Sequence, residues 1–534
     1  MGYAKMSGLI FLGVWLYSLG FGDAFLFSDD ASTPIDKVQT PVGEIHGFAS
    51  NVSFHGDDYQ VRMFLGIPYA KPPVGELRFM KPQLLTSLPT SPFLAVNFGS
   101  MCPQRSGFGP TPSEDCLFLN IYAPVNVENT SSRAVMVWIH GGAFLFGSAA
   151  STDGSVLSAY SDVIVVTINY RLGPLGFFTT HNQDAPGNYG LWDQHIAFQW
   201  LADNIAAFGG DPGNIMIFGA SAGGSGVLYQ TLYPGNKGLV KRAAVQSATM
   251  LDIDVGYFHA KQNASKQFAE FAGCYGNDSA DVLNCLRSIN ESDIVQITQD
   301  YMEIYLAQPG LINSWAPMPD GDFVPEEVIK ALTAIEKGNL ATPSADVFGS
   351  IELLVGNTNM DGILFYQDAL SNINRTGNVN DVTDITWEDV YAKVFTGIAE
   401  NTLKELPASL VLQAIQQEYT QWDDPLNITR LLRTLVDITT DYALMSVSYL
   451  AADGHKRLTN TTYVYQFATA PPGPSRFPPE MASETSAGHG DDVTFLFGFP
   501  YLFVFGMNES DVGPALWNTS KAMMRMWTNF AKTG

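Results

Sequence analysis

Short β-branched runs along this 534-residue chain alternate with stretches in which apolar side chains recur at helical spacing. The runs at 134–139, 163–168 and 215–218 lack polar alternation, which is typical of strands buried on both faces of a parallel sheet. Residues 191–208 carry an apolar helical face. This alternation predicts an α/β fold with a central, mostly parallel sheet flanked by helices.

Residues 42–48 and 61–67 have strand patterns with a polar turn between them, which is typical of a meander at a sheet edge. Three shorter strands are expected at 243–246, 351–355 and 463–467. The intervals 257–345 and 357–460 are mostly helical or irregular and show no internal repeat or hinge rich in Pro, Gly and Ser. We therefore expect a single domain over 25–534, with helical insertions on one sheet.

Composition narrows the function classes. Hydrophobic residues make up 46% of the chain and charged residues 15%, as in a globular protein with a large core. There are 53 acidic and 28 basic residues, for a formal net charge of -25. Such a charge disfavours nucleic acids and anionic membrane surfaces as partners.

The N-terminus has the pattern of a secretion signal. Lys5 precedes an apolar stretch at 9–22, and the small residues Gly22 and Ala24 suit cleavage after Ala24. We interpret 1–24 as a signal peptide, with an uncleaved anchor as the alternative. The mature chain is then expected to be extracellular or in the lumen of the secretory pathway.

Other features agree with secretion. Ten Asn-x-Ser/Thr sequons predict a glycoprotein. They begin at Asn51, Asn129, Asn263, Asn277, Asn290, Asn374, Asn427, Asn460, Asn508 and Asn518. The four cysteines fall in two close pairs, Cys102 with Cys116 and Cys274 with Cys285. In an oxidising compartment these pairs would close two small loops, and four free buried thiols are the alternative.

The apolar run 215–218 leads into Gly219-Ala-Ser221-Ala-Gly223. This spacing is typical of a nucleophile elbow, a sharp strand-to-helix turn that raises a serine hydroxyl above the sheet, although an ordinary glycine-rich turn has the same letters. In this architecture the partners follow in the order serine, acid, histidine. Ser221 is therefore the expected nucleophile, and its base and acid are sought downstream.

Three histidines follow Ser221, namely His259, His455 and His489. His455 lies in a basic Gly-His-Lys-Arg segment that we interpret as a solvated surface turn. His489 lies between two glycines just before an apolar run, where a loop can carry the ring close to another group. We expect His489 to be the general base.

The acid is expected just past the carboxyl end of a parallel strand, where open α/β sheets place their sites. Asp361 follows the strand at 351–355 and fits this position, whereas Asp346 and Asp368 are interpreted as surface charges. No metal or organic cofactor is required by this chemistry.

An oxyanion needs fixed backbone N–H donors. Gly141 and Gly142 follow the strand that ends at Ile139, and Ala222 follows the nucleophile, so these three residues are the expected oxyanion hole. A phosphate cradle is the alternative use of the glycine pair, but the segment has apolar neighbours and no nearby lysine.

Together these residues resemble the type B carboxylesterase and cholinesterase family of α/β-hydrolases, over nearly the whole chain. The motifs that carry the resemblance are FLGIPYA at 64–70, PPVGELRF at 72–79, SEDCLFLN at 113–120, HGGAF at 140–144, NYRLGPLGF at 169–177, NYGLWDQ at 188–194 and FGGDP at 208–212. The resemblance implies a triad of Ser221, Asp361 and His489, the oxyanion hole above and the two disulfides. It also implies an Arg78–Glu114 ion pair and Ser247 as a hydrogen-bond partner of the acid.

The chain departs from the family pattern at several places. Ala220 and Asp361 stand where the family more often has glutamate. The short 102–116 loop has no tryptophan to hold a quaternary ammonium, so choline esters are not expected as substrates. The C-terminal residues resemble a family helix that several tens of residues normally follow, so we expect the chain to lack that tail.

The residues that would form the walls of the substrate gorge have two interpretations. The resemblance places Leu311 and Asn313 at the acyl pocket, and Trp315, Leu364 and Phe365 at other walls. Plain core packing is the alternative for these residues.

The expected function is a secreted serine hydrolase that cleaves small-molecule carboxylic esters through a covalent acyl-enzyme. The family also includes members that have lost the triad, so a catalytically silent adhesion or storage protein on the same fold is the alternative. A lipase acting at an oil interface is a third reading.

Overall fold

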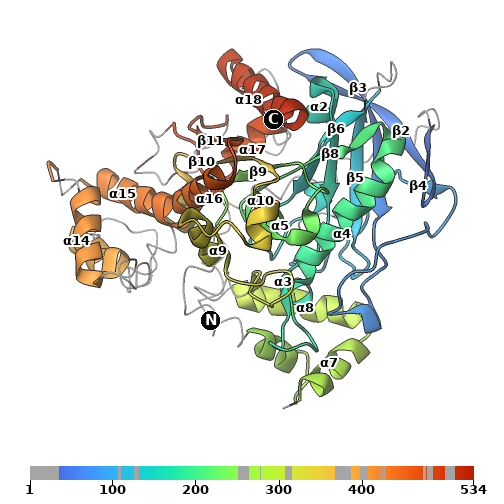
Figure 1. Ribbon diagram of the computed structural model, residues 1–534, viewed down its shortest axis with the longest axis horizontal. Coiled ribbons are helices and arrows are strands. Elements are labelled where there is room, and N and C mark those ends of the chain that lie inside the picture. Colours follow the sequence, from blue (N-terminus) through green and yellow to red (C-terminus); the bar gives the residue numbers. More distant parts are fainter. Residues whose placement is uncertain are drawn as a thin grey trace.

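In the computed structural model, the described residues form an 11-stranded sheet in the order β1-β2-β3-β5-β7-β6-β8-β9-β10-β11, with β4 paired to β2 (Figure 1). The structure describes residues 35–105, 110–125, 132–249, 264–276, 278–306, 315–366, 386–396, 398, 407–420, 422–424, 427–472, 477, 481, 485–499 and 511–534. Neighbouring strands from β7 to β11 are parallel, and those from β1 to β7 are antiparallel. The sheet confirms the expected α/β class.

The strands are β1 (Ile35–Thr40), β2 (Gly43–Phe54), β3 (Asp57–Pro68), β4 (Phe93–Leu94), β5 (Phe118–Pro124), β6 (Arg133–Ile139), β7 (Ile164–Ile168), β8 (Gly210–Ala220), β9 (Arg242–Gln246), β10 (Glu352–Thr358) and β11 (Thr462–Phe467). The α-helices are α2 (Ser155–Ser161), α3 (Gly173–Phe177), α4 (Tyr189–Asn204), α5 (Ala222–Leu232), α7 (Ser279–Ser288), α8 (Glu291–Leu306), α9 (Val328–Glu336), α10 (Pro343–Phe348), α12 (Trp387–Val390), α14 (Ala408–Tyr419), α15 (Ile428–Thr440), α16 (Ser446–Leu458), α17 (Asp491–Leu496) and α18 (Pro514–Thr533). Shorter 3₁₀ turns are η1 (Gly75–Leu77), η2 (Ala149–Ser151), η3 (Ile205–Phe208), η4 (Pro234–Asn236) and η6 (Asp361–Phe365), and two π-helical turns are η7 (Tyr391–Phe395) and η8 (Asp441–Met445).

Strand β6 shows why the central strands lack polar alternation. Val135 and Val137 pack into a core shared with α4 and α5, while Met136 and Trp138 pack into a second core shared with α17 and α18. Successive side chains of a strand point to opposite faces, and here both faces are covered by helices. Figure 1 shows α4 and α5 on one side of the sheet and α18 on the other.

Three strands of the sheet were not expected from the pattern, namely β1, the two-residue β4, and β5. β1 is short and polar, and β5 contains Asn120, whose side chain is buried. Asn120 accepts a hydrogen bond from Gly66 N–H at 2.9 Å and donates one to Thr167 at 3.0 Å. Because the neighbouring strands satisfy this amide, a polar residue is tolerated where the hydrophobic pattern alone predicts none.

A helical lobe extends away from the sheet at the left of Figure 1 and is named here the α14–α15 lobe. It consists of α12, η7, α14 and α15, whose apolar side chains form a cluster distinct from the two sheet cores. Met360, which follows β10, belongs to the same cluster. Through η8, α15 runs directly into α16, which packs on β10 and α9.

The interpretation of His455 as a solvated turn residue is wrong. The ring is fully buried in α16, where it hydrogen-bonds Thr462 at 2.7 Å and the carbonyl of Ile351 at 2.8 Å. Lys456 and Arg457, which suggested a surface turn, are exposed. The periodicity of a helix thus separates residues that are adjacent in sequence.

The two expected disulfides are present, Cys102–Cys116 and Cys274–Cys285. Sequon residues Asn51, Asn290, Asn460 and Asn518 are exposed, and Asn427 is half-buried at the start of α15. The other five sequon asparagines, Asn129, Asn263, Asn277, Asn374 and Asn508, lie outside the described residues, as do the segment 1–24 and Asp368.

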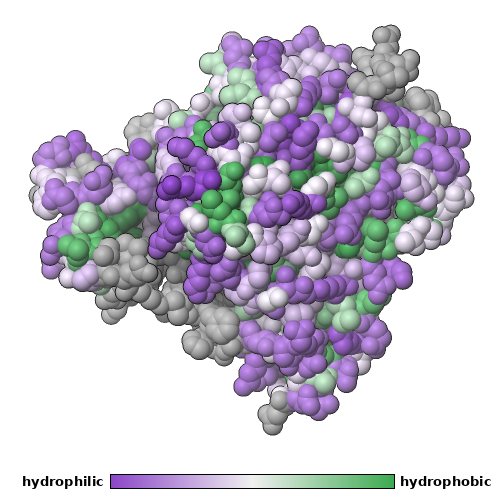
Figure 2. Space-filling view, viewed as in Figure 1, coloured by the Kyte–Doolittle hydropathy of each residue, from purple (hydrophilic) through white to green (hydrophobic). Residues whose placement is uncertain are grey.

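The surface face shown in Figure 2 is mainly hydrophilic, with apolar residues in scattered patches. Within the described part of the chain, the helices are all too short or too polar to cross a membrane. The apolar residues of the central strands, which gave the hydrophobic pattern, are mostly buried inside the molecule.

Candidate active site

The nucleophile elbow predicted from the Gly-x-Ser-x-Gly spacing is present. β8 ends at Ala220 and α5 begins at Ala222, with Ser221 alone between them. Ser221 has φ 60° and ψ -129°. A non-glycine residue with positive φ is strained, and such strain persists where the surrounding structure enforces it.

The glycines of the elbow are required by close packing of α5 on β6. A Cβ on Gly223 would lie 2.1 Å from the carbonyl oxygen of Ile139, and one on Gly219 would lie 2.6 Å from the same oxygen. No Cβ is accommodated at such distances from backbone. The two glycines therefore allow the strand and helix to approach closely enough to hold the turn.

The loop after β6 lies directly against Ser221. A Cβ on Gly141 would be 2.7 Å from the carbonyl oxygen of Ala220 and 3.2 Å from Cβ of Ser221. Gly142 has φ 106°, which only glycine adopts readily. Ala222 is the first residue of α5, so its N–H has no acceptor within the helix. Of the three expected oxyanion residues, Gly141 and Ala222 thus lie directly beside Ser221, and Gly142 follows Gly141 in the same loop.

A buried glutamine that the sequence analysis missed holds this loop. Gln104 is fully buried and pairs with both backbone groups of Gly147, accepting from its N–H and donating to its carbonyl at 2.8 Å each. It also donates to the carbonyl of Cys102 at 3.1 Å. These bonds fasten the disulfide loop to a segment in which Ala143 and Phe144 both have positive φ. The indication of this role in the sequence is that Gln104 lies two residues after Cys102, at the start of the disulfide loop.

The expected acid and base are in direct contact. Nδ1 of His489 lies 2.6 Å from Oδ1 of Asp361, whose side chain is fully buried. The second oxygen of Asp361 accepts from the Asn357 amide and from Thr358 N–H, both at 3.2 Å. A carboxylate in this position orients the ring and stabilises its protonated form.

Ser247 does not occupy the role that the resemblance implied. Its N–H donates to the carbonyl of Gly356 at 2.8 Å, but its buried hydroxyl has no hydrogen-bond partner among the described residues. Asn357 and Thr358 bind Asp361 instead. These partners come from the end of the strand that carries the acid, so local geometry satisfies the carboxylate.

Gln246 connects Ser221 to the loop that carries His489. Its carbonyl accepts from Ser221 N–H at 3.0 Å, and its side chain donates to Asp492 at 2.9 Å. Asp492 is buried three residues after His489 and also accepts from Tyr465 at 2.7 Å. Burial raises the pKa of the Asp492 carboxyl. Sequence reasoning missed this network, because a lone glutamine at a strand end carries no distinctive motif.

The structure brings Asp361 and His489 together and places Ser221 beside Gly141. Among the described residues no hydrogen bond joins the Ser221 hydroxyl to the ring of His489, and bonds of this kind are often long before substrate binds. The order of the strands supports the proximity of Ser221 and Asp361. Ser221 follows β8 and Asp361 follows β10, and β8, β9 and β10 are consecutive parallel neighbours whose carboxyl ends lie at one edge of the sheet.

The expected gorge residues that the structure describes divide into two groups. Trp315 is buried against Phe268 and Tyr301, which agrees with core packing. Leu364 and Phe365 are half-buried in η6, next to Asp361. Leu311 and Asn313 lie outside the described residues.

Asp346, which was not chosen as the acid, is exposed and pairs with Lys237, as expected of a surface charge.

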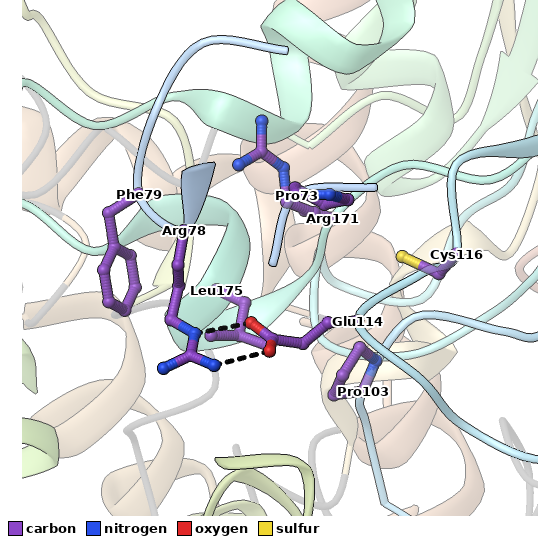
Figure 3. A pocket seen from close by; sticks show the side chains of 8 residues that line it. All are labelled: Pro73, Arg78, Phe79, Pro103, Glu114, Cys116, Arg171 and Leu175. Atoms are coloured by element: carbon purple, nitrogen blue, oxygen red, sulfur yellow. Dashed lines mark hydrogen bonds and ion pairs between the residues drawn. The ribbon is translucent and has the colours of Figure 1, made fainter. Parts of the chain in front are cut away.

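The implied Arg78–Glu114 ion pair is present and buried, with both hydrogen bonds at 2.6 Å (Figure 3). Figure 3 shows the pair lining a small pocket beside Cys116 and Leu175. Burial raises the pKa of Glu114, although Arg78 opposes this. No group of three or more His, Cys, Asp or Glu side chains suited to a metal ion occurs within the described ranges.

Comparison with known proteins identifies relatives along nearly the whole chain. The chain is 34% identical over 526 residues to the bile salt-activated lipase of Bos taurus, covering 94% of this chain and 80% of that protein. It is 31% identical over 542 residues to liver carboxylesterase B-1 of Rattus norvegicus, covering 97% and 89%. It is 32% identical over 568 residues to neuroligin-3 of Mus musculus, covering 97% and 64%.

The match to a family confirms both the resemblance and the fold expected from the sequence. The sheet, the elbow after β8 and the loop after β6 have the arrangement of an α/β-hydrolase. Over residues 35–534, the part of the chain that contains all of these features, this protein belongs to the carboxylesterase family.

Proposed function

We propose that this protein is a serine hydrolase that cleaves small-molecule carboxylic esters with a triad of Ser221, His489 and Asp361. The observation that carries the proposal is the 2.6 Å hydrogen bond between His489 and the buried Asp361. It is supported by the strained elbow that presents Ser221 beside the glycine loop. Relatives named as a carboxylesterase and a lipase agree with ester hydrolysis.

In the proposed reaction, Oγ of Ser221 attacks the ester carbonyl while His489 takes its proton. The oxyanion receives hydrogen bonds from N–H groups of Gly141, Gly142 and Ala222. Collapse of this intermediate breaks the bond to the alcohol, which leaves with the proton from His489. Water then attacks the acyl-enzyme by the same route, releasing the carboxylic acid and restoring the serine.

We propose that the protein acts outside the cell or in the secretory lumen, as a glycoprotein. Two disulfides in the structure favour an oxidising compartment. The exposed sequons Asn51, Asn290, Asn460 and Asn518 are accessible for glycans. Digestion of the secreted protein with an endoglycosidase is expected to lower its apparent mass.

The alternative is a catalytically silent adhesion protein, and the similarity to a neuroligin supports this alternative. The two proposals differ at Ser221. An enzyme requires its hydroxyl, whereas an adhesion surface does not. The contact between His489 and Asp361 favours the enzyme.

The test is hydrolysis of p-nitrophenyl acetate and butyrate by the purified protein and by Ser221→Ala. We expect the variant to lose at least about 10³-fold in kcat, because no covalent intermediate forms. Ser448→Ala, which alters a buried serine in α16, is the matched control and should keep wild-type turnover. Equal rates for wild type and Ser221→Ala would refute the proposal and favour the silent protein.

A further inference from the structure

Both backbone groups of Gly362, the residue after the proposed catalytic acid, are hydrogen-bonded to side chains of α15. Its N–H donates to Oγ1 of Thr440 at 2.8 Å, and its carbonyl accepts from Oγ1 of Thr439 at 3.1 Å. A Cβ on Gly362 would lie 2.4 Å from Thr440 N and from the carbonyl oxygen of Val436. The last turn of α15 therefore packs directly on the peptide beside Asp361.

Thr440 makes the better defined of the two contacts. Its hydroxyl donates to the carbonyl of Val436 at 2.7 Å, so a lone pair is directed to the N–H of Gly362. The Thr440 side chain is 2% exposed, which leaves little access for a water that could replace it. Thr439 has one hydroxyl hydrogen and three nearby carbonyls, of which Leu435 at 2.7 Å is closer than Gly362.

The acid loop is built into the core of the α14–α15 lobe as well as into the sheet. Met360, immediately before Asp361, is fully buried in the apolar cluster that includes Leu432 and Leu435 of α15. On its other side, Met360 N–H donates to the carbonyl of Ala487 in the loop that carries His489, at 3.0 Å. The acid is thus held between this helix and the base.

Thr440 also lies at a joint in the long helix. The α-helical hydrogen bonding of α15 ends at Thr440 and the π-helical turn η8 begins at Asp441. Before this point the helix belongs to the α14–α15 lobe, and after it α16 packs on β10. A π-turn rotates the side chains that follow it, which allows one helix to serve both surfaces.

We propose that Thr440 is a positioning residue, which holds the Gly362 peptide through its hydroxyl and thereby sets the orientation of Asp361 toward His489. The inference rests on the proposed function, since it assigns Thr440 a role through the triad. Loss of the hydroxyl leaves the Gly362 N–H buried without an acceptor, and the peptide is expected to move to regain one. A displaced acid orients the base less well in the transition state.

The test compares Thr440→Val with Thr440→Ser in p-nitrophenyl butyrate hydrolysis. Valine keeps the volume and removes the hydroxyl, whereas serine keeps the hydroxyl and loses a methyl group. We expect kcat to fall about tenfold in Thr440→Val with KM nearly unchanged, and to stay within about twofold of wild type in Thr440→Ser. A role in packing alone would give the reverse order.

Thr434→Val is the matched control, because Thr434 is buried in the same helix and its hydroxyl contacts the carbonyl of Tyr419 instead. It should keep kcat within about twofold. If Thr440→Val does not fold, Thr440→Ala replaces it: alanine and serine both lack the methyl group, and only alanine lacks the hydroxyl, so a tenfold difference between them is expected.

A kcat for Thr440→Val within twofold of wild type, or an equal loss in Thr440→Ser, would overturn the positioning role while Ser221-dependent hydrolysis by the wild type still stands. Wild-type protein without Ser221-dependent turnover would instead overturn the proposed function, and this inference with it.

Discussion

His140 illustrates how one buried side chain shapes the loop beside Ser221. Its ring stacks on Tyr170 at 4.4 Å between centroids, and its Nδ1 lies 2.8 Å from the carbonyl oxygen of Gly141. Burial lowers the pKa of His140 to about 4, although the bond to Gly141 opposes this. The ring is therefore neutral near pH 7 and keeps Nδ1–H as a donor that holds the Gly141 peptide in place.

This pKa predicts a dependence of stability on pH. Between about pH 4 and pH 6.5 the unfolded chain protonates this histidine while the folded chain does not, so stability falls as the pH is lowered through that window. His140 is expected to change the free energy of unfolding by about 3 kcal/mol across this window, because a shift of one pKa unit corresponds to about 1.4 kcal/mol. Urea unfolding at pH 7 and pH 4.5 measures it, and His140→Gln should lose less stability between these two values than wild type. An equal loss in both proteins would contradict the assignment.

At the scale of elements, the elbow depends on how closely α5 approaches β6. Gly223 and Gly226 lie on the same helix but meet different neighbours. A Cβ on Gly223 would meet two backbone carbonyls, at 2.1 Å and 2.8 Å, whereas one on Gly226 would meet the side chain of Gln194 at 3.2 Å. Backbone carbonyls of a central strand cannot shift without disturbing the sheet, but a side chain can adjust.

Gly223→Ala is therefore expected to lower the free energy of unfolding by more than about 3 kcal/mol, or to prevent folding, through overpacking at this contact. Gly226→Ala is the matched control. Alanine favours the helix by about 1 kcal/mol over glycine, which offsets the tighter contact, so its stability should stay within about 1 kcal/mol of wild type. Chemical denaturation of both variants checks the difference, and similar stabilities would argue against a close approach of α5 to β6.

At the scale of the whole molecule, Arg78 joins segments that are far apart in the sequence. It pairs with Glu114 inside the Cys102–Cys116 loop and donates to the carbonyls of Leu286 and Ile289 at the end of α7. Both members of the pair are 2% exposed. Removing one partner of such a pair leaves a charge buried without compensation.

Arg78→Met is expected to lower the free energy of unfolding by about 3 to 5 kcal/mol at pH 7. The loss should shrink at lower pH, because a protonated Glu114 carries no buried charge, and it should be smaller in the double variant Arg78→Met/Glu114→Gln. Lys237→Met, which breaks the exposed pair with Asp346, is the control and should change stability by less than about 1 kcal/mol. Equal effects of the buried and exposed substitutions in urea unfolding would contradict this account.

Local pattern was sufficient for the central strands and for the elbow. The unbroken apolar runs predicted β6, β7 and β8 because strands covered on both faces need apolar residues at every position. The Gly-x-Ser-x-Gly spacing predicted the strained turn at Ser221, since only glycine fits where backbone approaches this closely. Such requirements act on neighbouring residues and are visible in the sequence.

The hydrogen-bond partners of buried polar side chains could not be derived from local sequence pattern. His455 and His489 both sit in short polar segments, yet one is buried in α16 against β10 and β11, and the other faces Asp361. Likewise Asn357 and Thr358, rather than Ser247, donate hydrogen bonds to Asp361. A polar side chain takes whichever partner the folded chain brings within about 3 Å, so its partner depends on the assembled structure.

The sequence by itself determined the fold class, the parallel core of the sheet and the position of the elbow, because short-range packing and backbone constraints specify them. Only the tertiary structure decided that Gln104, Gln246 and Thr440 hydrogen-bond the segments around Ser221, His489 and Asp361. Their amide and hydroxyl groups are common in any sequence, and they acquire a role only when distant segments meet around them.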